Sequence, residues 1–364
     1  MYKNFFIFTG SRAEFYLLKE LIDSLLKNNF IINLIVSDES LDNELKSLNK
    51  NKNLKFIKAY IDKSITYKKK KISDLVNLFN SKLKRKISYE KLIIYGDRIE
   101  AFAMSIVAFQ NSCKIVHIGG GDETPNSLDN YFRNSITSMS NIHFVTNKLA
   151  KNKVMNFTKS KNVYNFGYLQ PAILPIHKKT YEIFQKKFIY KRPYFLITYH
   201  PNSLSNKNRT IYEINNLLNA LENFRENFNF IFTAPNKDEN SDLIKNKIIS
   251  FVNKNKKISL YEEALGQHYQ IFLKNTRLAL GNSSSIVYET VKYGTPALLI
   301  GNRQMGRELQ KNIHHVGNEK NDIIKNIKNI VSCVKNINEL KSGYHKEHTA
   351  NNISIKLKEV FKNE

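Results

Sequence analysis

The 364-residue chain is poor in cysteine, lacks long apolar runs and carries few acidic residues for its number of basic ones. Its two cysteines, Cys113 and Cys333, are too few for a disulfide framework or a cysteine-rich metal site. No stretch approaches the ~18 consecutive apolar residues of a transmembrane helix. The apolar N-terminal stretch ends at Gly10, which is too early for the apolar region of a signal peptide. We therefore expect a cytoplasmic protein without a membrane span.

The shortage of acidic residues leaves 57 Lys and Arg against 32 Asp and Glu, a formal charge of +25. A basic surface of this kind could bind nucleic acid. However, lysine is spread along the whole chain, and no helix-turn-helix, zinc-finger or RNP-type pattern is present. We therefore expect no nucleic-acid partner. We interpret the charge as a composition biased toward Lys, Asn and Ile, which also attracts anionic small substrates.

Arginine is scarce, and its placement is informative. Only ten arginines occur in the chain. A planar guanidinium can bind phosphate or carboxylate at two points, which lysine cannot do. The pattern is typical of a protein that binds phosphate groups. Five of the ten lie in loop motifs that carry Gly, Ser or Asp: Arg12, Arg98, Arg133, Arg303 and Arg307.

Short apolar runs alternate with helical patterns along almost the whole chain. The run at 5–8 is typical of a buried strand, and the apolar spacing at 13–28 predicts a helix. A second series of strands and helices begins at 194–199. This alternation predicts an α/β fold with two doubly wound parallel sheets. We expect an N-terminal domain at 1–170 and a C-terminal domain at 171–364, and leave open whether the last helix returns to the first domain.

Polar motifs follow the predicted strands at the points where those strands end. In doubly wound sheets, ligands bind beyond the carboxyl ends of the strands. Gly, Asn and Ser are common in the loops that follow strands, so they need no functional explanation at such points. Arg, His and Asp are not explained in this way. The sequence therefore predicts a binding site at these ends that contains Arg12, Asp97, Gly119–Asp122, His200, Asn236, Ser283 and Arg303.

The motif at 281–289 lies between a predicted strand and a helix expected at 286–293. Backbone N–H groups at the start of a helix, together with serine hydroxyls, can hold a pyrophosphate. Taken alone, a serine-rich helix start is usually only a cap. Glu289 strengthens the binding interpretation, because its carboxylate could accept both hydroxyls of a ribose.

Two further motifs each allow two interpretations. Asp97 precedes Arg98 at a strand end, so it is either a catalytic carboxylate or half of a structural ion pair. His200, which precedes Pro201, is either a capping residue or an acid or phosphate ligand. These residue types alone do not decide between the alternatives.

Taken together and in order, the motifs resemble the hydrolysing nucleotide-sugar 2-epimerases, best known as UDP-N-acetylglucosamine 2-epimerases that supply N-acetylmannosamine for sialic-acid synthesis. The strongest block is Leu280–Glu289 with 294–296 and 301–307, and the resemblance covers most of the chain. It implies a GT-B-like fold of two Rossmann-like domains with an active site in the interdomain cleft. The other similar stretches are Thr9–Glu14, Tyr95–Glu100, His117–Asp122, Asp129–Arg133, Tyr199–Pro201, Pro235–Asp238 and Leu265–Gln267.

The resemblance also implies roles for individual residues. The carboxylates around C2 of the sugar would be Asp97, Asp122 and Asp129, and His200 would assist the departing diphosphate. Within the nucleotide site, Glu289 would hold the ribose. The substrate and its nucleotide would be bound by a larger group: Arg12, Arg98, Arg133, Asn236, Ser283, Ser284, Ser285, Glu289, Arg303 and Arg307.

The reaction implied by the resemblance is an elimination followed by hydration. Breaking the C1–O bond releases nucleoside diphosphate, whose charge Arg and protonated His would stabilise, while a carboxylate removes the acidified proton at C2. Water then adds across the resulting glycal, and the C2 epimer leaves as a free sugar. This scheme uses no cofactor and no metal. Family members usually self-associate, so we expect a homo-oligomer, either a dimer or a tetramer.

Departures from the family pattern cluster at the sugar end of the site. Gly119 stands where many members carry Glu, Asn130 replaces the second residue of an Asp pair, and Asn134 replaces a His. We therefore expect retained nucleotide recognition and altered sugar recognition, with Asp122 or Glu123 in place of the missing Glu. The expected substrate is UDP-N-acetylglucosamine or a modified UDP- or GDP-linked 2-acetamido sugar, as in sialic or legionaminic acid synthesis. The alternatives are a GT-B glycosyltransferase and a binding protein with a decayed site.

Overall fold

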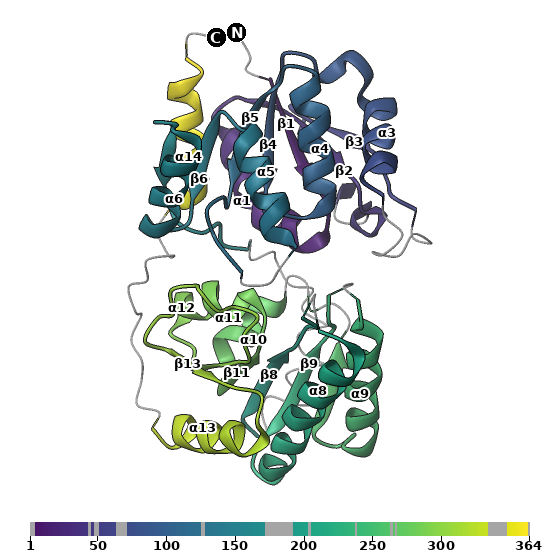
Figure 1. Ribbon diagram of the computed structural model, residues 1–364, viewed down its shortest axis with the longest axis vertical. Coiled ribbons are helices and arrows are strands. Elements are labelled where there is room, and N and C mark those ends of the chain that lie inside the picture. The colour runs from purple at the N-terminus through teal and green to yellow at the C-terminus, as the bar shows by residue number, and fades with distance from the viewer. Residues whose placement is uncertain are drawn as a thin grey trace. The chain divides into compact units, whose positions relative to one another are not determined.

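The computed structural model describes residues 4–42, 45–46, 51–62, 71–124, 128–171, 192–202, 205–236, 239–262, 265, 268–333 and 348–362. These residues form two compact units (Figure 1). The first unit holds the described residues up to Asp122, those from Leu128 to 171, and those from 348 onward. The second unit holds Glu123, Thr124 and the described residues from 192 to 333. Within the described part of the chain, no helix is long and apolar enough to cross a membrane.

The first unit is built on a seven-stranded parallel sheet with strand order β3-β2-β1-β4-β5-β6-β7. Its strands are β1 (Asn4–Thr9), β2 (Ile31–Val36), β3 (Leu54–Lys58), β4 (Lys91–Tyr95), β5 (Lys114–Ile118), β6 (Ile142–Val145) and β7 (Val163–Asn165). Its helices are α1 (Arg12–Lys27), α3 (Ile72–Leu83), α4 (Ile99–Gln110), α5 (Asp129–Met139), α6 (Lys148–Thr158) and α14 (Thr349–Val360). Short 3-10 helices lie at Glu39–Leu41 and Lys84–Ile87.

The second unit has a six-stranded parallel sheet with strand order β10-β9-β8-β11-β12-β13. Its strands are β8 (Tyr194–Thr198), β9 (Asn229–Thr233), β10 (Ser259–Glu262), β11 (Leu278–Gly281), β12 (Ala297–Ile300) and β13 (Ile313–Val316). Its helices are α8 (Lys207–Leu221), α9 (Ser241–Lys254), α10 (Tyr269–Asn275), α11 (Ser284–Tyr288), α12 (Thr290–Tyr293) and α13 (Lys320–Ser332), with a 3-10 helix at Glu222–Phe224. The prediction of two doubly wound parallel sheets is confirmed.

Local sequence explains why these elements begin where they do. The central strand β1 is buried from Phe5 to Thr9, as expected for a strand covered by helices on both faces. The next element, α1, begins after Ser11, whose hydroxyl accepts the N–H of Glu14 at 3.3 Å. The Glu14 carboxylate in turn accepts the N–H of Gly10 at 2.6 Å, a close variant of the capping box. This cap fixes the loop that leads from β1 into α1.

The helix expected at 286–293 is instead two short helices, α11 and α12, separated at Glu289. The Thr290 hydroxyl donates to the carbonyl oxygen of Ile286 at 2.6 Å. Such a bond from a threonine to the carbonyl four residues earlier bends a helix. The interruption therefore places Glu289 between two short helices, not inside one continuous helix.

The last helix, α14, lies in the first unit (Figure 1) and packs against α1. Its polar contacts to α1 are Asn28 Nδ2 to Ser354 Oγ at 2.9 Å and Ser24 Oγ to Asn351 Oδ1 at 3.3 Å. Just beyond the helix, Phe361 lies edge to face with Phe5 of β1, with ring centroids 5.5 Å apart. Chain segments from both ends of the sequence therefore share one core.

Two buried histidines lie side by side in the first sheet, since His117 of β5 pairs with His143 of β6. His117 makes hydrogen bonds through both ring nitrogens, to Gly96 O and to Thr137 Oγ1. Neither ring nitrogen of His143 has a hydrogen-bond partner among the described residues. Burial lowers the pKa of His143 to about 4. The His143 ring is therefore neutral at physiological pH.

Replacing this side chain (His143→Leu) is expected to flatten the acid side of the stability profile. The pKa of His143 is about 4 in the folded protein and about 6.5 in the unfolded chain. Between these values the unfolded chain binds a proton that the folded protein does not, so stability falls as the pH drops. From pH 7.5 to pH 5 this residue alone removes about 2 kcal/mol of unfolding free energy. Urea unfolding at both pH values should show a loss that is about 2 kcal/mol smaller in His143→Leu than in the parent protein, since the buried His117 and His200 still contribute in both.

The matched control is His314→Gln, because His314 is exposed on β13. This variant should show the same loss of stability between the two pH values as the parent protein. If His143→Leu also loses the same amount as the parent, His143 does not carry the predicted proton linkage.

Candidate active site

The predicted polar motifs lie at the carboxyl ends of the strands. In the first unit, Arg12 follows β1, Asp97 follows β4 and Gly119–Asp122 follow β5. In the second unit, the carboxyl ends of four strands are followed by His200 (β8), Asn236 (β9), Ser283 (β11) and Arg303 (β12). Because all strands of each sheet are parallel, each set lies along a single edge of its sheet. The expectation that the polar motifs follow strand ends is confirmed.

Arg133 of α5 organises the acidic end of the first unit. Its side chain is 3% exposed and forms an ion pair with Asp97, whose side chain is 27% exposed. The same guanidinium donates to the backbone oxygen of Asp122 at 2.6 Å and to Asn130 Oδ1 at 2.8 Å. One buried cation therefore joins the loops that follow β4 and β5, and leaves the Asp97 carboxylate partly accessible.

Asp122 is held by its side chain as well as by its backbone. Thr146, at the end of β6, donates from its hydroxyl to Asp122 Oδ1 at 3.0 Å. The preceding Gly121 has a φ of +84°, and a Cβ there would lie 2.5 Å from the carbonyl oxygen of Ala150. Only glycine fits in that position. The loop thus presents Asp122 in a defined place.

Gly119 occupies the position at which many members of the family that the sequence motifs resemble carry a glutamate. Its φ is +90°, a left-handed conformation that favours glycine over residues with a side chain. At this position the chain therefore has a left-handed backbone conformation that suits glycine, and the glutamate carboxylate of the family pattern is absent. Asp129, the third predicted carboxylate, begins α5 and is half-buried.

His117 also holds the loop that carries Asp97. It is fully buried, and its Nε2 lies 2.8 Å from Gly96 O, next to Asp97. Burial lowers the pKa of His117 to about 3, so the ring is neutral. With Nε2 donating to Gly96, Nδ1 is the ring acceptor and faces Thr137 Oγ1 at 3.0 Å. The sequence motif included this histidine, but its supporting role depends on the fold.

Arg98 is engaged by two buried carboxylates. Its guanidinium donates to both oxygens of Glu100, at 3.2 and 3.3 Å, and lies 3.7 Å from Glu14 Oε1. Burial raises the pKa of Glu14 to about 7, against the lowering effects of Arg98 and the Gly10 N–H. These contacts tie the loop before α1 to the start of α4. Neither Glu14 nor Glu100 was predicted as a site residue.

His200 is held in the second unit by three hydrogen bonds from two residues. Asn282, which is 1% exposed, accepts the His200 N–H at 2.8 Å and donates to the His200 carbonyl oxygen at 2.8 Å. The backbone N–H of Asn236 donates to His200 Nδ1 at 3.0 Å. Burial, followed by the charge of Arg303, lowers the pKa of His200 to about 3. The protonated histidine expected from the sequence is therefore replaced by a neutral ring that bears its proton on Nε2.

The serine motif is also held together by hydrogen bonds. Ser283 caps α11 and accepts both the N–H and the hydroxyl of Ser285, at 3.3 and 3.0 Å. The hydroxyls of Tyr269 and Ser285 are hydrogen-bonded at 2.7 Å. Ser284 is half-buried, whereas Ser283 and Ser285 are buried. Because α11 has only five residues, the donors of this motif are its hydroxyls and N–H groups and not a helix dipole.

Glu289 is 8% exposed and is held by a residue that the sequence did not single out. The side-chain amide of Gln270 donates to Glu289 Oε2, and Tyr293 donates from its hydroxyl to Gln270 Oε1 at 3.0 Å. Burial raises the pKa of Glu289 to about 7. A carboxylate with one fixed oxygen is suited to accept hydrogen bonds from a ligand's hydroxyl groups.

The two arginines that follow β12 have different surroundings. Arg303 Nη1 lies 3.5 Å from the carbonyl oxygen of Asn282, the residue that holds His200. The guanidinium of Arg307 stacks over the Tyr288 ring, 4.8 Å from its centroid, and donates to Thr124 Oγ1 at 3.2 Å. Arg303 is thus the one of the two placed beside the His200 loop.

The family model for UDP-N-acetylglucosamine 2-epimerase matches residues 25–358. A Campylobacter jejuni GDP/UDP-N,N'-diacetylbacillosamine 2-epimerase (hydrolyzing) is 35% identical over 240 residues, which cover 64% of this chain and 61% of that protein. Polysialic acid biosynthesis protein P7 of Escherichia coli is 30% identical over 97% of this chain and 93% of its own length.

Solved structures of this family share the fold. The UDP-GlcNAc 2-epimerase of Methanocaldococcus jannaschii, solved in complex with UDP-GlcNAc and UDP, is 19% identical with a TM-score of 0.79, and the match covers 98% of this chain and 99% of that chain. The Neisseria meningitidis enzyme bound to UDP-GlcNAc is 17% identical with a TM-score of 0.78, and the match covers 99% and 100% of the two chains. The two Rossmann-like units are therefore of the GT-B-like type. The sequence motifs, the fold and the family match agree, and the chain belongs to the UDP-N-acetylglucosamine 2-epimerase family of enzymes.

Proposed function

We propose that this protein is a hydrolysing nucleotide-sugar 2-epimerase, which converts a UDP- or GDP-linked 2-acetamido sugar into the free C2 epimer and nucleoside diphosphate. The observation that carries the proposal is the Asp97–Arg133–Asp122 arrangement in the first unit. It offers a partly accessible carboxylate on Asp97, and the same buried cation holds the backbone of Asp122, which carries a second carboxylate on another loop. Proton removal from carbon and proton delivery to carbon require two such groups.

The polar groups of the second unit suit the leaving diphosphate. The Nε2–H of neutral His200 can donate a hydrogen bond to a phosphate oxygen, and Arg303 beside its loop supplies positive charge. The hydroxyls of Ser283 and Ser284 offer further donors, whereas Ser285 already donates its N–H and its hydroxyl to Ser283 and supports the motif. In this assignment Glu289 accepts the ribose hydroxyls, and Arg12 is assigned to the phosphates.

In the proposed reaction the C1–O bond breaks, and its electrons leave with the diphosphate. Asp97 removes the proton from C2, and the C2–H electrons form the C1=C2 bond of a glycal. Asp122, protonated from solvent, then delivers a proton to C2 from the opposite face, while water adds its oxygen to C1 and releases its extra proton to solvent. Asp129 is assigned to the same sugar region. We propose that Arg133 holds the two acid–base residues and does not bind the nucleotide, because its guanidinium already contacts Asp97, Asp122 and Asn130.

One relative suggests which sugar to test first. The Campylobacter protein is named for diacetylbacillosamine, a 2-acetamido sugar with a second acetamido group. Gly119 removes the family's usual carboxylate from the sugar end, which fits a substrate that differs from N-acetylglucosamine. We therefore propose UDP- or GDP-linked diacetylbacillosamine as the first candidate and UDP-N-acetylglucosamine as the second. Free sugars of this type feed the synthesis of sialic and legionaminic acids.

The decisive experiment incubates the purified protein in heavy water with each of these nucleotide sugars and no acceptor. Proton NMR should show nucleoside diphosphate and a free epimerised sugar that carries deuterium at C2. Deuterium is expected because the proton delivered to C2 comes from solvent. Epimerised product without deuterium would exclude the elimination route, and turnover only after an acceptor is added would favour the glycosyltransferase alternative.

A further inference from the structure

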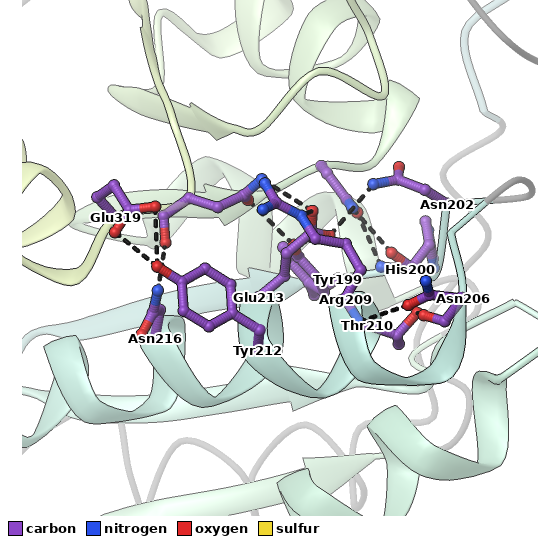
Figure 2. Close-up of polar contacts among 12 residues, drawn as sticks. Tyr199, His200, Asn202, Asn206, Arg209, Thr210, Tyr212, Glu213, Asn216 and Glu319 are labelled. Carbon is purple, nitrogen blue, oxygen red and sulfur yellow. Dashed lines mark hydrogen bonds and ion pairs between the residues drawn. The ribbon is translucent and has the colours of Figure 1, made fainter.

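A polar network in the second unit centres on Glu213 of α8, a residue outside all the motifs described above (Figure 2). Glu213 is 5% exposed, and both of its oxygens are engaged. Arg209, one turn earlier in the helix, donates to Oε1 at 2.7 Å. Asn318, after β13, donates to the same oxygen at 3.1 Å. A buried carboxylate with this many donors is fixed in position.

The other oxygen of Glu213 faces the loop that carries His200 (Figure 2). Asn202 Nδ2 donates to Oε2 at 3.2 Å, and the Tyr199 hydroxyl lies 3.5 Å from the same atom. The Tyr199 hydroxyl also lies 3.3 Å from Asn318 Oδ1. Glu213 therefore contacts the residue just before His200 and the residue two positions after it, without contacting His200 itself.

Burial and the nearby carboxylate of Glu213 raise the pKa of Tyr199 well above its usual value. The phenol therefore remains protonated and acts as a donor toward Glu213 or Asn318. Asn202 can contribute only its amide N–H groups to a carboxylate. The hydrogen bonds around Glu213 thus require a side chain that accepts on both oxygens, which glutamine in this position cannot do.

We propose that Glu213 is a positioning residue for His200. By holding Tyr199 and Asn202 it sets the path of the loop, so that the Nδ1 of His200 meets the Asn236 N–H and the Nε2–H faces the leaving phosphate. This inference rests on the proposed role of His200 in the epimerase reaction. A displacement of about 1 Å at a reacting group can lower a rate by roughly 10²-fold.

The test compares Glu213→Gln with the matched control Tyr212→Phe. Tyr212 is the neighbouring residue on α8, and its hydroxyl contacts only the exposed Glu319 among the residues drawn in Figure 2. We expect Glu213→Gln to lower kcat by roughly 10- to 100-fold, and Tyr212→Phe to leave it within about 2-fold. Each variant is also made in the His200→Ala background. There Glu213→Gln should change kcat by less than about 2-fold, because the group that it positions is absent.

A second readout does not depend on turnover. Nitrogen-15 NMR of the imidazole in the parent protein should show a single neutral tautomer with the proton on Nε2, and Glu213→Gln should show mixed tautomers or exchange broadening for His200. An equal loss of kcat in both backgrounds, or an unchanged His200 signal in Glu213→Gln, overturns the proposal. If the parent protein is inactive on every nucleotide sugar, the proposed function fails, while the NMR comparison still decides the role of Glu213.

Discussion

Asp97→Asn is expected to lower the turnover of the nucleotide sugar by roughly 10²- to 10⁴-fold and to leave the affinity for the nucleoside diphosphate within about 3-fold. The amide cannot accept the C2 proton, but it is nearly the same size and can still accept a hydrogen bond from Arg133. The groups assigned to the nucleotide lie mainly in the second unit and are unchanged. Turnover followed by NMR and affinity measured by calorimetry separate these two effects.

The control for this substitution is Asp23→Asn, which removes an ion-paired carboxylate from the outer side of α1. Asp23 has 45% of its side chain exposed and pairs with Lys19, and neither residue belongs to the predicted site motifs. We expect no change in turnover for this variant. If Asp97→Asn lowers turnover and nucleotide affinity by the same factor, Asp97 serves the structure and not the proton transfer.

Arg133→Met is expected to affect both stability and turnover. Removing one partner of a buried ion pair typically lowers stability by about 3–5 kcal/mol, and the lower end applies because Asp97 is 27% exposed. The variant also leaves the Asp122 carbonyl and Asn130 without their donor. Urea unfolding should show the loss of stability, and turnover should fall because the two loops are no longer joined.

Arg133→Lys tests whether charge alone is enough. A lysine ammonium cannot reach Asp97, Asp122 and Asn130 with the planar geometry of a guanidinium, so we expect most of the activity to remain lost. The control is Arg225→Met, since Arg225 is 60% exposed and pairs with Glu222 at 3.6 Å on the surface. A fully active Arg133→Lys or Arg133→Met protein would contradict the assigned role.

The sequence was sufficient to predict the parts of the fold that depend on local pattern. The apolar run predicted at 5–8 lies within β1, and the second series begins at β8 at Tyr194 as predicted, because each is an apolar run that ends at a polar loop. Strand β3 was not predicted because it lies at the sheet edge, where only Leu54 is buried and two of the five residues, Lys55 and Lys58, are exposed lysines. Edge strands carry a weaker apolar signal because one side of the strand has no neighbour.

The candidate site was predictable at the level of which residues follow strand ends, and not at the level of their partners. Arg133 was selected for its guanidinium, but its pairing with Asp97 joins residues 36 positions apart. His200 is held by Asn282, 82 positions away. Such partners are set by strand order, which no local pattern encodes. The protonation of His200 was misjudged for the same reason, since its pKa depends on burial.

The position of α14 has a consequence for how the protein is made. Ribosomes release the chain from its N-terminus, and domains usually fold in that order during synthesis. Here the first sheet is complete after β7, yet the side chains of α1 and β1 that face α14 remain uncovered until residues 349–361 have been translated. A nascent chain therefore carries an unfinished apolar surface through the synthesis of the whole second unit, and premature termination before 349 would yield an aggregation-prone fragment.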